Sequence, residues 1–177
     1  YIFINILTIS RILFAAIIYF LLSKGGNYTL ALILFFVAGL SDYFDGYLSR
    51  KYQKSSQLGE ILDPIADKIL LIFVFFGLAI SLSSYLIGFM GSIIISREIW
   101  VSALRDLNSR NNNSGATKVT YLAKIKTSIQ FFTILVYLIG LASNVMLLII
   151  IADILLIIST LITLYTGYNY TLNTFNN

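Results

Sequence analysis

The chain has 177 residues, of which 58% are hydrophobic and only 11% are charged, a composition far more apolar than that of a soluble globular domain. It contains no cysteine and no histidine, which excludes thiolate catalysis, disulfide frameworks, imidazole bases and Cys/His zinc sites. Its formal charge of +4 comes from 12 basic and 8 acidic residues. We therefore expect a membrane protein whose chemistry depends on carboxylates, amines, guanidinium groups and hydroxyls.

Six apolar segments follow one another along the chain, each with about the 20 residues that a helix needs to cross a hydrocarbon core roughly 30 Å thick. None has the period-2 alternation typical of a membrane β-barrel strand. The sequence predicts an all-α integral membrane protein with a single domain, residues 1–177, and six transmembrane helices at 4–22, 28–46, 61–80, 85–105, 121–141 and 145–166. The polar end, 169–177, is predicted to be a disordered tail.

Positive charge is concentrated in two of the connections between these segments. The connections after the second and fourth segments, with the adjoining segment ends, hold Arg50, Lys51, Lys54, Arg105, Arg110, Lys118, Lys124 and Lys126. The connections on the opposite side hold Lys24 alone. Because Lys and Arg are more frequent in cytoplasmic loops, we expect the charged connections and both termini to face the cytoplasm.

Four aspartates lie near the ends of the second and third segments, where carboxylates are costly: at a helix centre each costs about 2.5 to 3.5 kcal/mol on insertion scales. Asp42 and Asp45 are spaced i, i+3, and Asp63 and Asp67 are spaced i, i+4, so each pair shares a helix face. Four adjacent carboxylates need protonation or bound cations, and oxygen ligands favour Mg²⁺ or Mn²⁺, two of which this set could hold. The alternative is that they cap helices or pair with Arg50, Lys51 and Lys68.

These aspartates belong to a longer spaced motif. The chain reads D-Y-F-D-G-Y-L-S-R from Asp42, then eight residues, then G-E-I-L-D-P-I-A-D ending at Asp67. This resembles the signature of the CDP-alcohol phosphatidyltransferase family, D-x-x-D-G-x-x-A-R, eight residues, G-x-x-x-D-x-x-x-D. Ser49 in place of alanine is the one departure.

The resemblance implies roles for individual residues. Asp42, Asp45 and Asp63 would coordinate two Mg²⁺ or Mn²⁺ ions, while Asp67 would contact a metal and act as general base on the acceptor alcohol. The site for the CDP moiety would be lined by Thr8, Asp45, Gly46, Arg50 and Gly59. Chemically, the glycines allow close approach to the backbone and Arg50 offers a guanidinium fork to a phosphate.

Further short motifs are similar to those of one branch of this family, the bacterial phosphatidylglycerophosphate synthases. They are N-I-L-T-I-S-R ending at Arg11, D-P-I-A-D-K ending at Lys68, Arg97-Glu98 with the later Arg105, and K-I-K-T from Lys124. Ile4 and Ala123 depart from the usual Pro and Gly. This likeness implies CDP-diacylglycerol as donor, glycerol 3-phosphate as acceptor, a multi-pass protein of the inner (cytoplasmic) membrane, a homodimer, and an active site on the cytoplasmic side.

An acceptor that carries its own phosphate needs a second basic site. The candidates are Arg97, Arg105, Lys124 and Lys126. Arg97 and Arg105 are eight residues apart and so lie on nearly the same helix face. The alternative is that these cations extend to the lipid headgroups without binding a substrate.

Two other functions remain open from the sequence. A sister enzyme of the family would use another acceptor, as in the cardiolipin synthase or phosphatidylinositol-phosphate synthase types. A cation transporter would instead place its carboxylates near the midplane of the membrane. In each case the expected partner is the lipid bilayer, and we expect no nucleic acid. Asp153, near the opposite side, is expected to cap a helix or pair with Lys24, and Trp100 to serve in packing.

Overall fold

The computed structural model describes residues 2–52, 57–111, 115 and 121–175. Within these ranges the side chains of 2–7, 42–52, 57–61, 63–64 and 123–124 lie outside the description. Across the described residues the chain forms six α-helices: α1 (Ile2–Ser23), α2 (Tyr28–Tyr52), α3 (Gln57–Ser81), α4 (Tyr85–Arg110), α5 (Tyr121–Ser143) and α6 (Met146–Phe175). Five of the six predicted segments lie within one of these helices, and the sixth, 145–166, begins one residue before α6.

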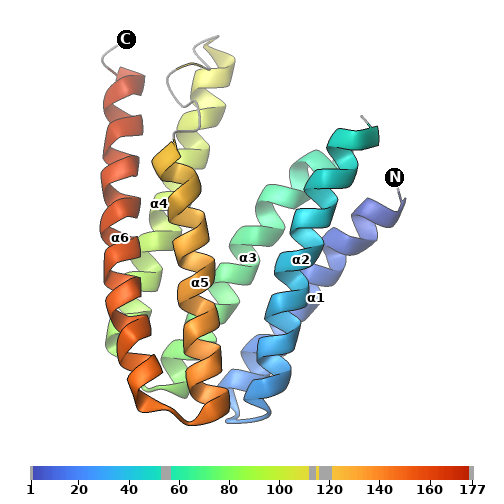
Figure 1. The fold of residues 1–177 in the computed structure, drawn as a ribbon. Coiled ribbons are helices and arrows are strands. Elements are labelled where there is room, and N and C mark those ends of the chain that lie inside the picture. Colours follow the sequence, from blue (N-terminus) through green and yellow to red (C-terminus); the bar gives the residue numbers. More distant parts are fainter. Residues whose placement is uncertain (1, 53–56, 112–114, 116–120, 176–177) are drawn as a thin grey trace.

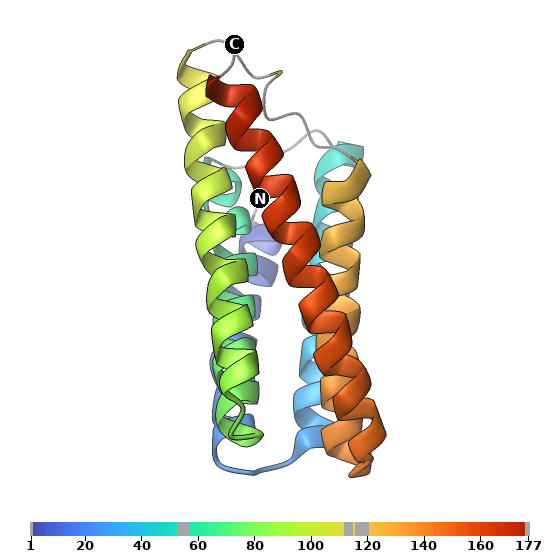
Figure 2. The same cartoon turned by 90° about the vertical axis from the view of Figure 1, so that its left-hand side faces the viewer.

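The helices form a ring of neighbours, in the order α1, α2, α5, α6, α4 and α3, with α3 packed again on α1. The tight turns after α1, α3 and α5 lie at the lower end of the bundle in Figure 1. The upper end holds the first residues of α1, α3 and α5 and the last residues of α2, α4 and α6 (Figures 1 and 2). Both predicted aspartate pairs therefore belong to the upper half of the bundle, since they lie late in α2 and early in α3.

Packing follows helical periodicity. The fully buried positions of α1 recur every three or four residues: Thr8, Arg11, Ala15, Ile18 and Leu22. Small residues let helices approach closely, as at Gly39 of α2, where a Cβ would lie 2.4 Å from ring atoms of Phe131 on α5. The outward faces are apolar too, with Leu161 62% and Phe89 65% exposed. The bundle thus has an apolar core that also contains polar side chains, and an apolar outer surface.

Three helical segments among the described residues are long and apolar enough to cross a membrane: Tyr85–Arg110, Ile125–Ser143 and Met146–Phe175. Two shorter apolar helical segments are Thr8–Ser23 and Tyr28–Ser41. The all-α fold is confirmed, and crossing of the membrane by all six helices stays a prediction.

The predicted disordered tail is wrong for residues 169–175, because α6 continues to Phe175, and residues 176 and 177 lie outside the described part of the chain. Tyr170 is buried against α4 residues Val101 and Leu104. Two threonines add contacts with α4: Trp100 Nε1 donates to Thr171 Oγ1 at 2.9 Å, and Asn108 Nδ2 donates to Thr174 Oγ1 at 2.9 Å. These tertiary contacts hold a polar sequence in helical form.

Asp153 also differs from expectation. The hydroxyl of Tyr137 on α5 donates to Asp153 Oδ1 at 2.6 Å. Lys24 instead lies over the ring of Phe20, with its Nζ 5.8 Å from the ring centroid. Asp153 therefore joins α5 to α6 at the lower end of the bundle.

Candidate functional site

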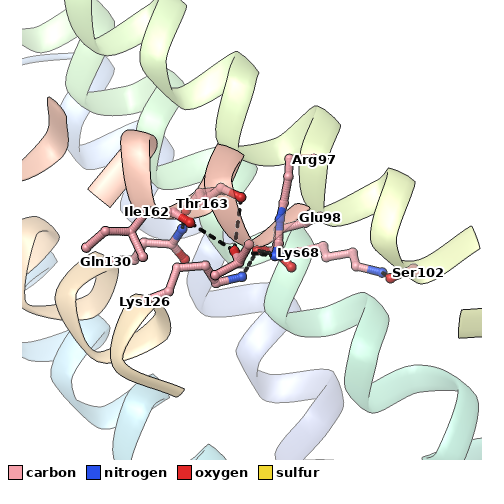
Figure 3. Close-up of polar contacts among 9 residues, drawn as sticks. Lys68, Arg97, Glu98, Ser102, Lys126, Gln130, Ile162 and Thr163 are labelled. Carbon is pink, nitrogen blue, oxygen red and sulfur yellow. Dashed lines mark hydrogen bonds and ion pairs between the residues drawn. The ribbon is translucent and has the colours of Figure 1, made fainter. Parts of the chain in front are cut away.

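Two of the four predicted acceptor cations, Arg97 of α4 and Lys126 of α5, meet at Glu98 beside α6 (Figure 3). Arg97 Nη1 donates to Glu98 Oε1 at 3.2 Å, and Lys126 Nζ of α5 donates to the same oxygen. The side chains of Arg97 and Lys126 are each only 6% exposed, and that of Glu98 is 22% exposed. Two buried cations thus pair with one carboxylate oxygen of the protein itself, and neither side chain extends outward from the bundle.

The second guanidinium nitrogen of Arg97 is held by α6. Its Nη2 donates to Thr166 Oγ1 at 2.6 Å. The Thr166 hydroxyl lies 2.9 Å from the carbonyl oxygen of Ile162, to which it donates, so its lone pairs are free to accept from Arg97. Arg105 lies two turns further along α4, with its Cζ 6.0 Å from the ring centroid of Tyr170. The structure therefore brings Arg97, Arg105 and Lys126 to one region.

Further polar side chains, one of them the cation Lys68, continue the cluster into the bundle. Gln130 Nε2, one turn after Lys126, donates to Thr163 Oγ1 at 3.0 Å, and Gln130 is buried. On the side of α3, Lys68 Nζ donates to Ser102 Oγ of α4 at 2.6 Å. The cluster is thus fixed to α3, α4, α5 and α6 by hydrogen bonds between helices, which orient its long side chains.

Asp67, the predicted base, forms an ion pair with α1. Arg11 Nη1 donates to Asp67 Oδ1 at 2.7 Å, with the Arg11 side chain fully buried and the Asp67 side chain 51% exposed. The contact differs from the alternative named from the sequence, in which Lys68 would be the partner. Thr8, predicted for the CDP site, is buried one turn before Arg11 on the same face of α1.

A pocket of about 110 Å³ joins Asp67 to the interior between α2, α3 and α5. Its polar lining includes Asp67, Thr127 and Gln130, and the rest is apolar, including Phe35 and Phe131. Because Gln130 lies one turn from Lys126, this pocket and the acceptor cluster are adjacent. A carboxylate, a basic cluster and an apolar wall therefore border one another.

Seven predicted site residues have side chains outside the described part of the structure: Asp42, Asp45, Gly46, Arg50, Gly59, Asp63 and Lys124. The described side chains contain no group of three or more acidic residues able to hold a metal. Asp67 fits one ligand of a hard divalent ion, since it offers a half-exposed carboxylate at the upper end. The metal set itself stays a prediction.

Arg11 is the main residue of this region to which sequence reasoning gave no role. It was recognised as part of a motif, and a charged residue within the apolar first segment was itself a signal of function or pairing. The α6 residues Thr166 and Tyr170 carried no comparable signal, because isolated Thr and Tyr are common in membrane helices.

Comparison with known proteins decides the family. A profile of the CDP-alcohol phosphatidyltransferase family matches residues 2–165. The chain belongs to this family. The resemblance carried by the spaced aspartate motif is thereby confirmed.

Individual relatives share one description. A CDP-diacylglycerol–glycerol-3-phosphate 3-phosphatidyltransferase of Rickettsia bellii is 37% identical over 171 residues, covering 94% of this chain and 91% of the relative. The protein of that name from Rickettsia felis is 35% identical over 169 residues, with the same two coverages. The one from Escherichia coli K12 is 31% identical over 129 residues, covering 71% of this chain and 70% of the relative.

Proposed function

We propose that this chain transfers the phosphatidyl group of CDP-diacylglycerol to glycerol 3-phosphate, giving phosphatidylglycerophosphate and CMP. The observation that carries the proposal is the buried meeting of Arg97 and Lys126 beside the pocket of Asp67. The relatives that share about a third of the sequence bear the name of this activity. Family membership favours a transferase over the cation transporter.

The acceptor site has an excess of positive charge that suits a phosphate monoester. Its described cations are Arg97, Arg105, Lys126 and Lys68, and Glu98 supplies one negative charge, which leaves three positive charges in excess. A phosphate monoester carries nearly two negative charges at neutral pH. Glycerol 3-phosphate presents such a group, whereas the phosphodiester of phosphatidylglycerol carries only one charge. The cluster therefore favours glycerol 3-phosphate over the acceptor of a cardiolipin synthase.

The donor needs a site that is polar at one end and apolar at the other. Its reacting pyrophosphate is charged, and its acyl chains stay in the bilayer. The pocket lined by Asp67 offers both kinds of surface, since it combines a carboxylate with the aromatic walls of Phe35 and Phe131. The apolar outer faces of the helices suit a multi-pass protein, which we place in the inner membrane with the upper end toward the cytoplasm. A homodimer is the expected assembly.

The chemical step is a direct displacement. Asp67 accepts the proton of the primary hydroxyl of glycerol 3-phosphate, the freed oxygen forms a bond to the β-phosphorus of CDP-diacylglycerol, and the bond from that phosphorus to CMP breaks. Arg11 orients the Asp67 carboxylate through their 2.7 Å contact. The basic cluster holds the acceptor phosphate, which fixes the position of the attacking hydroxyl relative to Asp67.

A pair of Mg²⁺ or Mn²⁺ ions, held by Asp42, Asp45, Asp63 and Asp67, would neutralise charge on the pyrophosphate. The oxygen-only donor set suits these ions, and no histidine or cysteine exists in the chain to favour zinc.

The test is an acceptor panel. Purified protein is incubated with CDP-diacylglycerol, Mg²⁺ and, in turn, glycerol 3-phosphate, phosphatidylglycerol, an inositol phosphate and serine, and CMP release is measured. We expect release with glycerol 3-phosphate alone, and none from the Asp67→Asn variant. CMP release with another acceptor would show that the chain has the activity of a sister enzyme of the family.

A further inference from the structure

One turn of α6 shapes the acceptor cluster, although it carries no recognised motif. Tyr170 is only 2% exposed, and its ring faces two cations of α4. The Cζ atom of Arg97 lies 5.8 Å from the ring centroid, and that of Arg105 lies 6.0 Å from it. Both distances are within the range of cation–π attraction. The ring of Tyr170 therefore contacts both arginines at once.

The same turn fits closely against Arg97. A Cβ at Gly167 would lie 3.0 Å from Cγ and 3.1 Å from Nε of Arg97, so a methyl group there would require the arginine to shift by a few tenths of an ångström. One residue earlier, Thr166 accepts the 2.6 Å hydrogen bond from Nη2. Hydrogen bonding, close packing and ring contact from one helical turn thus fix a side chain that has many rotamers in isolation.

We propose that residues 166–170, the α6 turn, are a positioning element that sets the spacing of Arg97 and Arg105 for the acceptor phosphate, with Tyr170 as its central residue. This inference rests on the proposed acceptor site. It adds that affinity for the acceptor depends on residues that do not bind it. Nη1 of Arg97 donates to Glu98 and Nη2 donates to Thr166, so the turn holds one of the two terminal nitrogens of the guanidinium.

The experiment measures KM for glycerol 3-phosphate and for CDP-diacylglycerol in mixed micelles at fixed surface dilution. Replacing Tyr170 by Leu removes the ring from both arginines. We expect acceptor KM to rise about 3- to 30-fold, the range that corresponds to cation–π attraction from exposed to desolvated sites, with donor KM nearly unchanged. Tyr170→Phe keeps a ring, so its acceptor KM should stay closer to that of the wild type.

Gly167→Ala provides an independent route, since its methyl group would displace Arg97 while leaving Tyr170 in place. It should also raise acceptor KM and leave donor KM nearly unchanged. It keeps the proposal testable if Tyr170→Leu does not fold, as judged by gel filtration and thermal unfolding in detergent. The matched control is Tyr165→Leu, which changes an α6 tyrosine that is 57% exposed, and both KM values should stay at their wild-type levels.

Arg97→Ala separates the two proposals. If it raises acceptor KM while folded Tyr170→Leu and Gly167→Ala do not, the acceptor site stands and the role of the α6 turn is refuted. If Arg97→Ala itself leaves acceptor KM unchanged, the proposed acceptor site fails, and the positioning role fails with it. A parallel rise of both KM values in Tyr170→Leu would also contradict the proposal, because it would indicate a general structural effect.

Discussion

Glu98 offers a sharp test of the buried cluster, since its carboxylate pairs with both Arg97 and Lys126. Glu98→Gln keeps the size and one acceptor oxygen but removes the charge. Leaving buried charge without its partner costs about 3 to 5 kcal/mol when the partner is deleted outright. Because glutamine can still accept a hydrogen bond, we expect a loss of about 2 to 3 kcal/mol in the free energy of unfolding.

Asp106→Asn is the matched control, because it is also an acid-to-amide change on α4. Asp106 pairs with Arg110 at 2.8 Å, but the two side chains are 63% and 76% exposed. Exposed i, i+4 pairs contribute about 0.3 to 0.5 kcal/mol. The two variants are compared by unfolding titrations with SDS in mixed micelles. Equal losses in both would refute the buried, paired character of the cluster.

The same unfolding titration can test whether glycerol 3-phosphate binds to the cluster. If the cluster binds its phosphate, the ligand stabilises the folded wild-type protein, by about 1.4 kcal/mol at ten times the dissociation constant. Glycerol at the same concentration should leave the unfolding midpoint unchanged, since it lacks the phosphate. Equal effects of the two compounds would show that the cluster does not recognise phosphate.

Three further predictions concern the reaction. Chelation with EDTA should abolish activity, and Mg²⁺ or Mn²⁺ should restore it; full turnover in excess EDTA would eliminate the metal role of the aspartates. Asp67→Asn should abolish transfer while retaining more CDP-diacylglycerol binding than Asp42→Asn, and equal loss of binding would show that their roles are not divided. Lys126→Ala should raise acceptor KM about ten- to a hundredfold with donor KM constant, as expected for a lost charge-assisted contact. The measurement is steady-state kinetics with each substrate varied in turn. An unchanged acceptor KM would show that Lys126 has no such role.

The helices were predictable because local sequence determines them. Apolar segments of about 20 residues separated by short polar stretches leave little freedom, and Ser84 begins α4 as an N-cap whose Oγ accepts from the backbone N–H of Ile87. The end of α6 was not predictable in the same way. Its threonines and asparagines favour a loop locally, and the contacts with Trp100 and Asn108 that keep it helical come from another helix.

The candidate site likewise combines features that follow from one segment of sequence with features that depend on contacts between helices. The shared face of Arg97 and Arg105 follows from their spacing on one helix, and both do lie near the ring of Tyr170. The ion pair of Arg11 with Asp67 joins residues 56 positions apart, so it depends on the packing of α1 against α3. No periodicity within one segment encodes such a partner, and neither does any pattern point to the turn of α6 behind the arginines.

The most direct test of the central claim follows the acceptor phosphate into lipid. Purified protein is incubated with CDP-diacylglycerol, Mg²⁺ and glycerol 3-phosphate labelled with ³²P, and lipid-extractable label is measured alongside CMP. We expect labelled phosphatidylglycerophosphate to form with one CMP per labelled lipid, and neither product to form with Asp67→Asn. CMP release without label in the lipid, or equal labelling by Asp67→Asn, would contradict the proposed transfer.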